Sequence, residues 1–500
     1  MRRRSPTVVF AIAIALSTAL STGCGDEALH VRYQAERHLW QADRDRAALP
    51  GNAAGDGFAQ WDALAARYES IAAHYGSWGF DPGVPDPYRA DLRRITGTAW
   101  LGAVDVRAGC ADSLGARDVL GAVIDRFAGT PIAVDMHVRS SGVALADGDS
   151  ARAVEHLHRV WSAVRGSERD RRAHLDTPGR IARLAPDERR AEAPAYAWAA
   201  AEYRRVIETG RRRDVALATL ELADLALDFD DKSAALDILE PLTSSMLARA
   251  EPEPGDARIM RRIVEAMARA LARGDLEPEA LEPALEWALD HGADAGRTLT
   301  AVGNALDDRG RLDEALTVYE RIRHRYDDAE WAPRALMSAA RIRSRRGKWD
   351  QAFVDLKLLE ARYALTPPAL RVPLEIVSLN RRRGTHAEAA EALRRAEQTY
   401  RRLMDRLPRG GHGDLLQELL IETLERQGRY SDAHAERLEW IDRASGSVEE
   451  LHRLRASIEA GRNNLLADEM IDPLVQRMAE RFPNTRLGRR AAVRLAAKGS

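Results

Sequence analysis

The sequence predicts an all-α protein, built as a solenoid of antiparallel helix pairs. Helix-favouring Ala, Leu, Arg and Glu dominate its 500 residues, whereas β-branched and aromatic strand formers are sparse, which excludes a mainly β protein. A pattern of large and small apolar residues also returns along the chain, as expected when each unit buries its apolar side against the next. The chain is too long for one compact domain. Its formal net charge of −2 argues against nucleic-acid binding through bulk positive charge.

The first 23 residues have the pattern of a signal peptide. Three arginines precede the apolar run Thr7–Leu20, which is too short for a dedicated membrane span. Small residues then lead to Cys24, which resembles a bacterial lipobox, where the cysteine is lipidated and becomes the mature N-terminus. The sequence departs from that pattern at one place, because Ser21 stands where a large aliphatic residue is usual and Leu20 lies one position earlier. An ordinary cleaved signal peptide with an incidental cysteine is the alternative.

Cysteine usage fits the lipidated form. The chain holds only Cys24 and Cys110, so a lipid on Cys24 leaves Cys110 without a partner. A bridge between the two is conceivable if no lipid is added. Because no later apolar run approaches eighteen residues, we expect everything after Cys24 to be soluble.

The repeat is cleanest over residues 295–325. Small or apolar residues mark one face of a first helix, Gly310 ends it, and a second helix shows the same spacing. These positions are Leu299, Val302, Gly303, Leu306, Leu312, Ala315, Tyr319 and Ile322. Ala315 is small where two helices must approach closely, and Tyr319 fills the space beside it. We expect Ala315, and Ala352 in the next copy, to lie against the first helix of their own pair.

The same frame recurs at fixed steps. Gly347 and Gly384 repeat Gly310, each thirty-seven residues after the one before. Further copies centre on Gly148 and Gly428, and one over 222–242 has Asp230 where Gly is expected. A second signature places an aromatic residue before a short polar turn at the end of a pair, at Tyr75, Phe127, Tyr326, Tyr363 and Phe482.

These patterns divide the chain into segments. We expect a signal peptide over 1–23, N-terminal helical repeats over 24–164 and a solenoid over 194–500 that ends in a capping helix near 485–497. The stretch 165–193 contains Pro178, Gly179 and Pro186, and half of its residues 165–192 are charged, which predicts a solvated linker or a bent connection.

The sequence resembles the tetratricopeptide-repeat lipoproteins of bacterial envelopes. The likeness rests on the repeated packing frame of the helix pairs, on the aromatic residues before the turns that end the pairs (the aromatic exits), and on Cys24. The most similar patterns are those of the outer-membrane barrel-assembly lipoprotein and the periplasmic Tol-associated cell-division coordinator, although this chain has many more repeats than the former. The resemblance implies a non-catalytic scaffold for protein partners, anchored by lipid and facing the periplasm at the outer membrane. It also implies that the first helix of each pair lines a concave face.

Catalytic chemistry finds little support in the sequence. No metal-protease, P-loop, dinucleotide-binding or nucleophile-elbow motif occurs, so we expect no enzyme, cofactor or metal site. The closest histidines, His156 and His158, point to different sides of a helix. Two alternatives to the anchored scaffold remain: a soluble periplasmic adaptor without lipid, and the helical part of a murein-cleaving enzyme.

Candidate binding residues come from the first helices. Positions one turn around from the packing frame carry arginines over two successive copies, and acidic residues over the next. The arginines are Arg334, Arg341, Arg345, Arg371, Arg381 and Arg382. They predict a basic wall that grips an acidic, extended protein segment, since the guanidinium fork holds carboxylates by two hydrogen bonds. Solvated charges on arginine-rich helices are the alternative.

Overall fold

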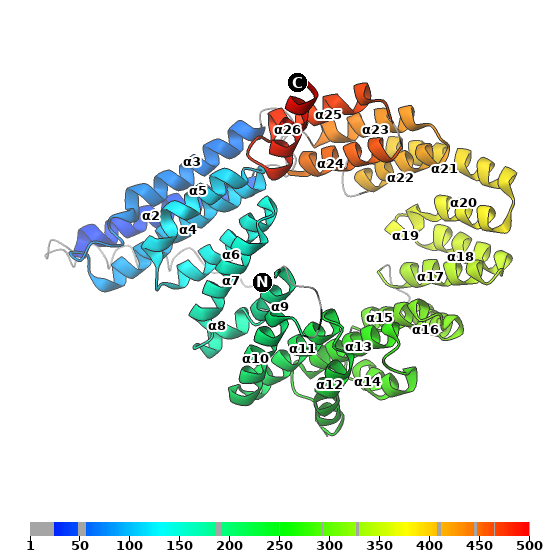
Figure 1. The fold of residues 1–500 in the computed structure, drawn as a ribbon, viewed down its shortest axis with the longest axis horizontal. Coiled ribbons are helices and arrows are strands. Elements are labelled where there is room, and N and C mark those ends of the chain that lie inside the picture. Colours follow the sequence, from blue (N-terminus) through cyan, green and yellow to red (C-terminus); the bar gives the residue numbers. More distant parts are fainter. Residues whose placement is uncertain are drawn as a thin grey trace, which may run out of the picture. The chain divides into compact units, whose positions relative to one another are not determined.

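The computed structural model describes residues 25–48, 57–185, 190, 192–249, 251–292, 294–326, 330–407, 412–444, 448–464 and 466–499. Over these ranges the chain forms twenty-five α-helices, one 3-10 helix and no strand, so the predicted all-α class is confirmed (Figure 1). The predicted signal peptide and Cys24 lie outside the described residues. None of the described helices is both long enough and apolar enough to cross a bilayer.

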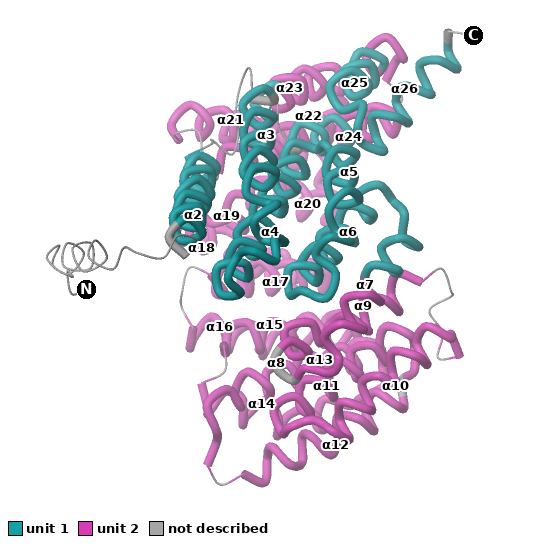
Figure 2. The backbone as a smooth tube through the Cα atoms, turned by 90° about the vertical axis from the view of Figure 1, so that its left-hand side faces the viewer, with its two compact units in different colours: residues 1–156, 442–455, 472–500 teal, residues 157–441, 456–471 magenta. Residues whose placement is uncertain are grey.

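The chain divides into two compact units (Figure 2), residues 1–156, 442–455 and 472–500 in unit 1 and residues 157–441 and 456–471 in unit 2. The first part of unit 1 contains α2 (Gly25–Ala48), α3 (Gly57–Gly76), α4 (Asp86–Gly109), α5 (Ser113–Val123), the 3-10 helix η1 (Ile124–Phe127) and α6 (Pro131–Asp147). Helix α7 (Ser150–Val164) continues into unit 2. Near the C-terminus, α24 (Val448–Asn463) and α25 (Asp468–Arg481) are divided between the units, and α26 (Arg486–Gly499) belongs to unit 1.

Unit 2 holds the longest run of pairs. It contains α8 (Glu168–Ala173), α9 (Thr177–Leu184), α10 (Pro194–Thr209), α11 (Arg212–Asp228), α12 (Lys232–Leu247), α13 (Asp256–Arg273), α14 (Pro278–Asp290), α15 (Ala295–Asp308), α16 (Leu312–Arg325), α17 (Ala332–Arg345), α18 (Trp349–Arg362), α19 (Pro367–Leu370), α20 (Val372–Arg383), α21 (His386–Arg406), α22 (Gly413–Arg426) and most of α23 (Tyr430–Arg443). From α9 to α22, consecutive helices pack on one another. Within this unit the first helices, such as α13, α15 and α17, lie on the inner side of a curve, and the second helices on its outer side (Figure 1).

The predicted packing frame is confirmed at the clearest copy. Ala315 and Ala352 are each 0% exposed. A methyl group added at Gly303 would come within 2.8 Å of the Tyr319 ring, so only glycine lets α15 approach α16 this closely. The burial of Ala315 and Ala352 agrees with the expectation that each lies against the first helix of its own pair.

Four tyrosines belong to the largest fully buried side chains, and each lies on the second helix of a pair: Tyr68, Tyr203, Tyr319 and Tyr400. Three of the hydroxyls bond to the first helix of their own pair, and that of Tyr400 bonds to the end of α19, directly before α20. Tyr68 donates to Asp43 at 2.7 Å, Tyr319 to Asn304 at 2.7 Å, and Tyr400 to the Leu370 carbonyl at 3.0 Å. Tyr203 accepts from the Gly179 amide at 3.0 Å. A buried hydroxyl without such a bond would cost free energy, so these bonds hold the pairs in register.

Helix ends follow the predicted glycines. Gly310, Gly347, Gly384 and Gly428 all have positive φ, between 72° and 81°, which favours glycine. Asp230 takes the same left-handed conformation, with φ of 57°, where the frame predicts glycine. Its short polar side chain tolerates that region better than most.

The aromatic exits share a turn in three of the five cases. Phe127, Tyr363 and Phe482 are each followed three residues later by a threonine, whose amide and hydroxyl both donate to the aromatic residue's carbonyl. The next helix starts directly after that threonine. One local motif thus ends a pair and starts the following one.

The stretch 165–193 differs from the solvated linker that its charge predicts. Two short helices occupy it, α8 and α9, and α9 serves as a first helix against α10. Ile181 and Ala182 are buried on α9, so a short apolar face lies within a charged sequence. The units divide after His156 instead.

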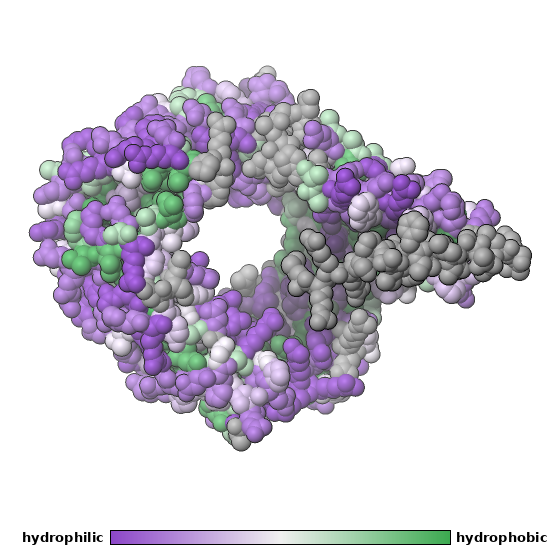
Figure 3. All heavy atoms as spheres, turned by 180° about the vertical axis from the view of Figure 1, so that it is seen from behind, coloured by the Kyte–Doolittle hydropathy of each residue, from purple (hydrophilic) through white to green (hydrophobic). Residues whose placement is uncertain are grey.

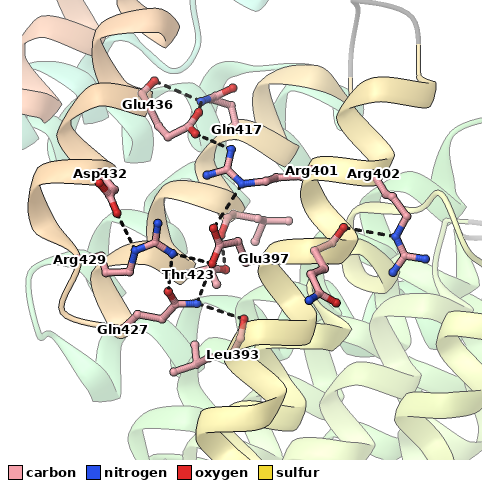
Figure 4. Close-up of polar contacts among 12 residues, drawn as sticks. Leu393, Glu397, Arg401, Arg402, Gln417, Thr423, Gln427, Arg429, Asp432 and Glu436 are labelled. Atoms are coloured by element: carbon pink, nitrogen blue, oxygen red, sulfur yellow. Dashed lines mark hydrogen bonds and ion pairs between the residues drawn. The ribbon is translucent and has the colours of Figure 1, made fainter.

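Neighbouring pairs are joined by polar side chains as well as by apolar contacts. In the network of Figure 4, the Glu397 carboxylate on α21 accepts from Gln427 at 3.2 Å and from Arg429 at 2.8 Å, both following α22. Arg401 bonds to Glu397 at 3.3 Å and to Glu436 of α23 at 2.9 Å. Burial acts to raise the pKa of Glu397, but these hydrogen bonds outweigh it and the pKa lies below its ordinary value.

We predict that Glu397→Gln destabilises the chain by about 1.5–3 kcal/mol at neutral pH, since a charge-assisted network loses its shared acceptor. Because the folded pKa of Glu397 is lowered, its stabilisation is complete above the unfolded value and is lost as pH falls through the folded value. The melting difference between wild type and variant should therefore shrink as pH falls below about 4.5.

Glu391→Gln is the matched control. Glu391 lies on the same helix and also pairs with two arginines, Arg394 and Arg395, but both belong to α21 itself. Its replacement should change melting little. Equal losses for both variants would contradict a role of Glu397 in joining pairs.

Candidate binding surface

The six candidate arginines lie on or beside α17 and α20, two neighbouring first helices of unit 2, and all six are exposed. Apart from Arg334, each contacts a residue on or at the end of a different first helix. Residues that are far apart in sequence therefore come together along one layer of helices, as the repeat frame predicts.

Three of these arginines meet carboxylates. Arg341 Nε donates to Glu375 Oε1 of α20 at 3.0 Å, and Arg345 bonds to Asp307 of α15. The Arg371 guanidinium lies 4.0 Å from the Glu422 carboxylate of α22. Their charges are thus balanced by acids from the chain itself.

The other three make no ion pair with any described residue. Arg334 lies over the Trp331 ring, 5.1 Å from its centroid. Arg381 donates to the Arg426 carbonyl at 3.1 Å, and Arg382 lies 3.4 Å from the Ser344 hydroxyl. A neutral acceptor orients each of the latter two guanidinium groups without cancelling its charge, so these arginines form the part of the surface suited to an acidic ligand.

Ion pairs between successive first helices, like those of Arg341 and Arg345, continue along the inner side of unit 2. Arg297 of α15 bonds to Glu265 of α13 at 2.9 Å, and Arg269 of α13 bonds to Asp224 of α11 at 2.8 Å. In these two ion pairs and in Arg341–Glu375, the partners are 32 to 45 residues apart in sequence, which is about one repeat. These ion pairs were not predicted from the sequence. Opposite charges spaced by one repeat on the exposed side of the first helices were the signal that could have found them.

A second candidate surface lies on α2. Ala28, Ala35, Leu39 and Ala42 are buried against unit 1, whereas the opposite face carries Tyr33 and Trp40, which are 63% and 59% exposed. Arg37 and Arg44 share that outer face, since residues three and four apart on a helix are neighbours. The Arg44 guanidinium lies over the Trp40 ring, 5.7 Å from its centroid. This face, Tyr33–Arg37–Trp40–Arg44, is called the α2 face below.

A third surface lies on the outer helices of unit 2. Phe353, Val354 and Leu358 of α18 are exposed, and Val354 borders a groove of about 680 Å³ between α16 and α18. Asp313, Glu320 and Asp350 also line this groove. Elsewhere the face of the molecule drawn in Figure 3 is mainly hydrophilic, with apolar side chains in separate patches.

The titratable side chains singled out by the sequence form no shared centre. The His156 ring meets His137, whereas His158 meets Trp198, so the two histidines point in different directions as expected. Cys110 is buried directly after α4, and burial raises the pKa of its thiol to about 11. Among the described residues, no group of His, Cys, Asp and Glu is arranged to hold a metal ion.

Comparisons with known proteins find similarity of structure only. No protein-family model matches the chain, and no curated protein is significantly similar in sequence. A human IFIT1 dimer with PPP-AAAA is 12% identical and covers 80% of this chain and 91% of its own, with a TM-score of 0.28. The P58(IPK) TPR domain is 15% identical and covers 74% of this chain and 98% of its own, with a TM-score of 0.19. A Rap protein complexed with competence and sporulation factor is 12% identical and covers 86% of this chain and 99% of its own, with a TM-score of 0.29. The tetratricopeptide-like class rests on the helix pairs, frames and caps described above.

Proposed function

We propose that this chain is a non-catalytic scaffold that binds protein partners in a bacterial cell envelope and is held at the membrane by a lipid on Cys24. The observation that carries the scaffold role is the layer of first helices in unit 2, where five of the six candidate arginines contact neighbours on other repeats. A surface organised before binding loses less side-chain entropy when a ligand arrives.

The partner that suits this surface is an extended, acidic protein segment. Arg334, Arg381 and Arg382 have no carboxylate partner among the described residues, and they come from two successive first helices. Carboxylates spaced along an extended peptide could reach them in turn, whereas a compact ligand would reach only one. Arg341, Arg345 and Arg371 then support the surface through their own acids rather than the partner's.

The α2 face supports the membrane anchor. Helix α2 begins at Gly25, directly after the residue proposed to carry the lipid. Aromatic side chains are favoured at the membrane–water interface, and arginines there meet anionic headgroups. One acyl chain alone holds a protein weakly, so a second contact of this kind strengthens the anchor.

The soluble periplasmic adaptor remains the second candidate. It requires the same binding surface on the first helices, without a lipid on Cys24. The two candidates therefore differ only in their attachment to the membrane, and separate experiments test the surface and the anchor.

For the surface, we predict that Arg381→Glu with Arg382→Glu abolishes capture of the protein partners that the wild type retains from detergent-solubilised envelopes. Partner carboxylates would then face two acids instead of two guanidinium groups. Helicity and melting should stay near wild type, because neither arginine is held by an ion pair among the described residues. Capture by the wild type should weaken as salt rises, since the Debye length is about 8 Å at physiological ionic strength.

The matched control for this test is Arg394→Glu with Arg395→Glu. These arginines are exposed on the second helix α21 and pair only with Glu391. The control should keep all partners. Loss of the same partners in both double variants would show that overall charge, and not the first-helix surface, decides capture.

For the anchor, we predict that Cys24→Ala removes labelling by a fatty-acid probe and moves the protein into the soluble fraction or leaves it on an uncleaved signal. Cys110→Ala is the control, because the buried Cys110 thiol is not available for acylation. Absence of label on the wild type would exclude the lipid and leave the soluble adaptor.

A further inference from the structure

A basic cavity in unit 2 contains none of the six candidate arginines described above. It has a volume of about 500 Å³ and opens where α11 and α13 begin. Seven arginines line it: Arg172, Arg211, Arg212, Arg213, Arg249, Arg258 and Arg262. Only two acids, Glu253 and Asp256, share that lining. Its size lies in the range of small-ligand sites, about 300–1,000 Å³.

The placement of these arginines works against helix stability. Arg211, Arg212 and Arg213 stand at the start of α11, where the helix dipole favours negative charge. Cations there lower the stability of the helix, because they face the partial positive charge of its N-terminus. A local choice that opposes the fold is expected mainly where function requires it.

Several of the arginines are fixed by acids of the chain. Arg172 donates to the buried Asp214 at 2.6 Å, and Arg249 bonds to Asp256. Burial acts to raise the pKa of Asp256, but the Arg249 side chain and the Glu253 amide outweigh it and lower that pKa. Asp256 therefore stays ionised and holds Arg249 in place.

Arg262 is fixed in the same way by two acids of α11. It bonds to Glu221 at 2.9 Å and to Asp224 at 3.1 Å. Arg212 pairs with Glu253 at the edge of the cavity, where both side chains are more than half exposed. The walls of the cavity are thus built from internally paired guanidinium groups.

Two further arginines of the lining have no such partners. Arg213 and Arg258 are exposed, and neither forms an ion pair with any residue that the structure describes. They lie in the first turns of α11 and α13, helices of 17 and 18 residues. Neither helix has a side-chain hydrogen bond from its N-cap residue, so the amides of both first turns add partial positive charge near the same cavity.

Part of the cavity lining is apolar. Ala216, Leu217, Pro254 and Ile259 contribute to the lining between the arginines. A bare ion would leave these side chains in contact with water, whereas an ester with an apolar body would cover them. The lining therefore suits a ligand with a charged head and an apolar part.

From this geometry we propose that the cavity binds a phosphate monoester or diphosphate, with the charged oxygens on Arg213 and Arg258. Guanidinium forks and helix N-termini are both suited to phosphate oxygens. The phosphate could belong to a free small molecule or to a phosphorylated side chain of a protein, because the chemistry at the cavity is the same.

The test measures binding of four probes to the purified chain by isothermal titration calorimetry: inorganic phosphate, inorganic diphosphate, phenyl phosphate and a phosphoserine hexapeptide. We expect diphosphate to bind more tightly than phosphate because it carries more charge, and phenyl phosphate to bind more tightly than phosphate because its ring covers the apolar part of the lining. If the peptide binds at least as tightly as phenyl phosphate, the bound phosphate belongs to a phosphorylated protein. If the peptide binds more weakly, the phosphate belongs to a free small molecule. Failure of all four to bind would overturn the proposal.

Substitutions locate the site. Arg213→Ala with Arg258→Ala should weaken diphosphate binding at least tenfold, and Arg394→Ala with Arg395→Ala should leave it unchanged. Because Arg213 opposes the α11 dipole, the first pair should leave the melting temperature equal or higher, whereas a purely structural role predicts a lower one.

An acidic peptide is the competing ligand. Hexaglutamate carries enough charge to bind any basic surface but has no phosphate group. Binding of hexaglutamate more tightly than phenyl phosphate, or an equal loss of diphosphate binding in both double variants, would contradict the proposed phosphate site.

Discussion

Close approach of the two helices within each pair is the constraint on which the rest of the structure depends. A methyl group at Gly303 would lie 2.8 Å from the Tyr319 ring of the same pair. The same contact recurs between pairs, where a methyl group at Gly102 of α4 would lie 2.6 Å from the Tyr68 ring of α3. These distances leave no room for a side chain, so a large buried aromatic ring faces glycine backbone. Since each hydroxyl also bonds to a polar group nearby, the rings fix both the separation and the register of the helices.

Fixed pairs in turn determine where exposed charges lie. Once α15, α17 and α20 repeat one orientation, an arginine on one first helix comes within reach of an acid on the next, as with Arg345 and Asp307. Such pairs at exposed positions contribute little stability each, but they hold guanidinium groups in place. The candidate surface and the basic cavity share this arrangement, in which arginines paired with acids accompany arginines that form no ion pair with any described residue.

Local signals made much of the fold predictable from sequence. Gly310 and Ala315 mark a helix end and a close contact through their own chemistry, and both were found where the frame predicts them. Helix α9 was missed because its apolar face is only a few residues long within a charged stretch. The cavity was missed for another reason: Arg172, Arg213 and Arg258 belong to three segments, and only the packing of α8, α11 and α13 brings them together.

Hydrogen exchange on two variants of α18 tests the packing constraint most directly. Ala352 is 0% exposed and Ala361, on the same helix, is exposed. Ala352→Leu should overpack its pair by about 1–3 kcal/mol and speed amide exchange in α17, α18 and the adjacent helices, because damage in a repeat array spreads mainly to its neighbours. Ala361→Leu should leave exchange near wild type. Equal exchange in the two variants, or faster exchange throughout the chain for Ala352→Leu, would contradict the account.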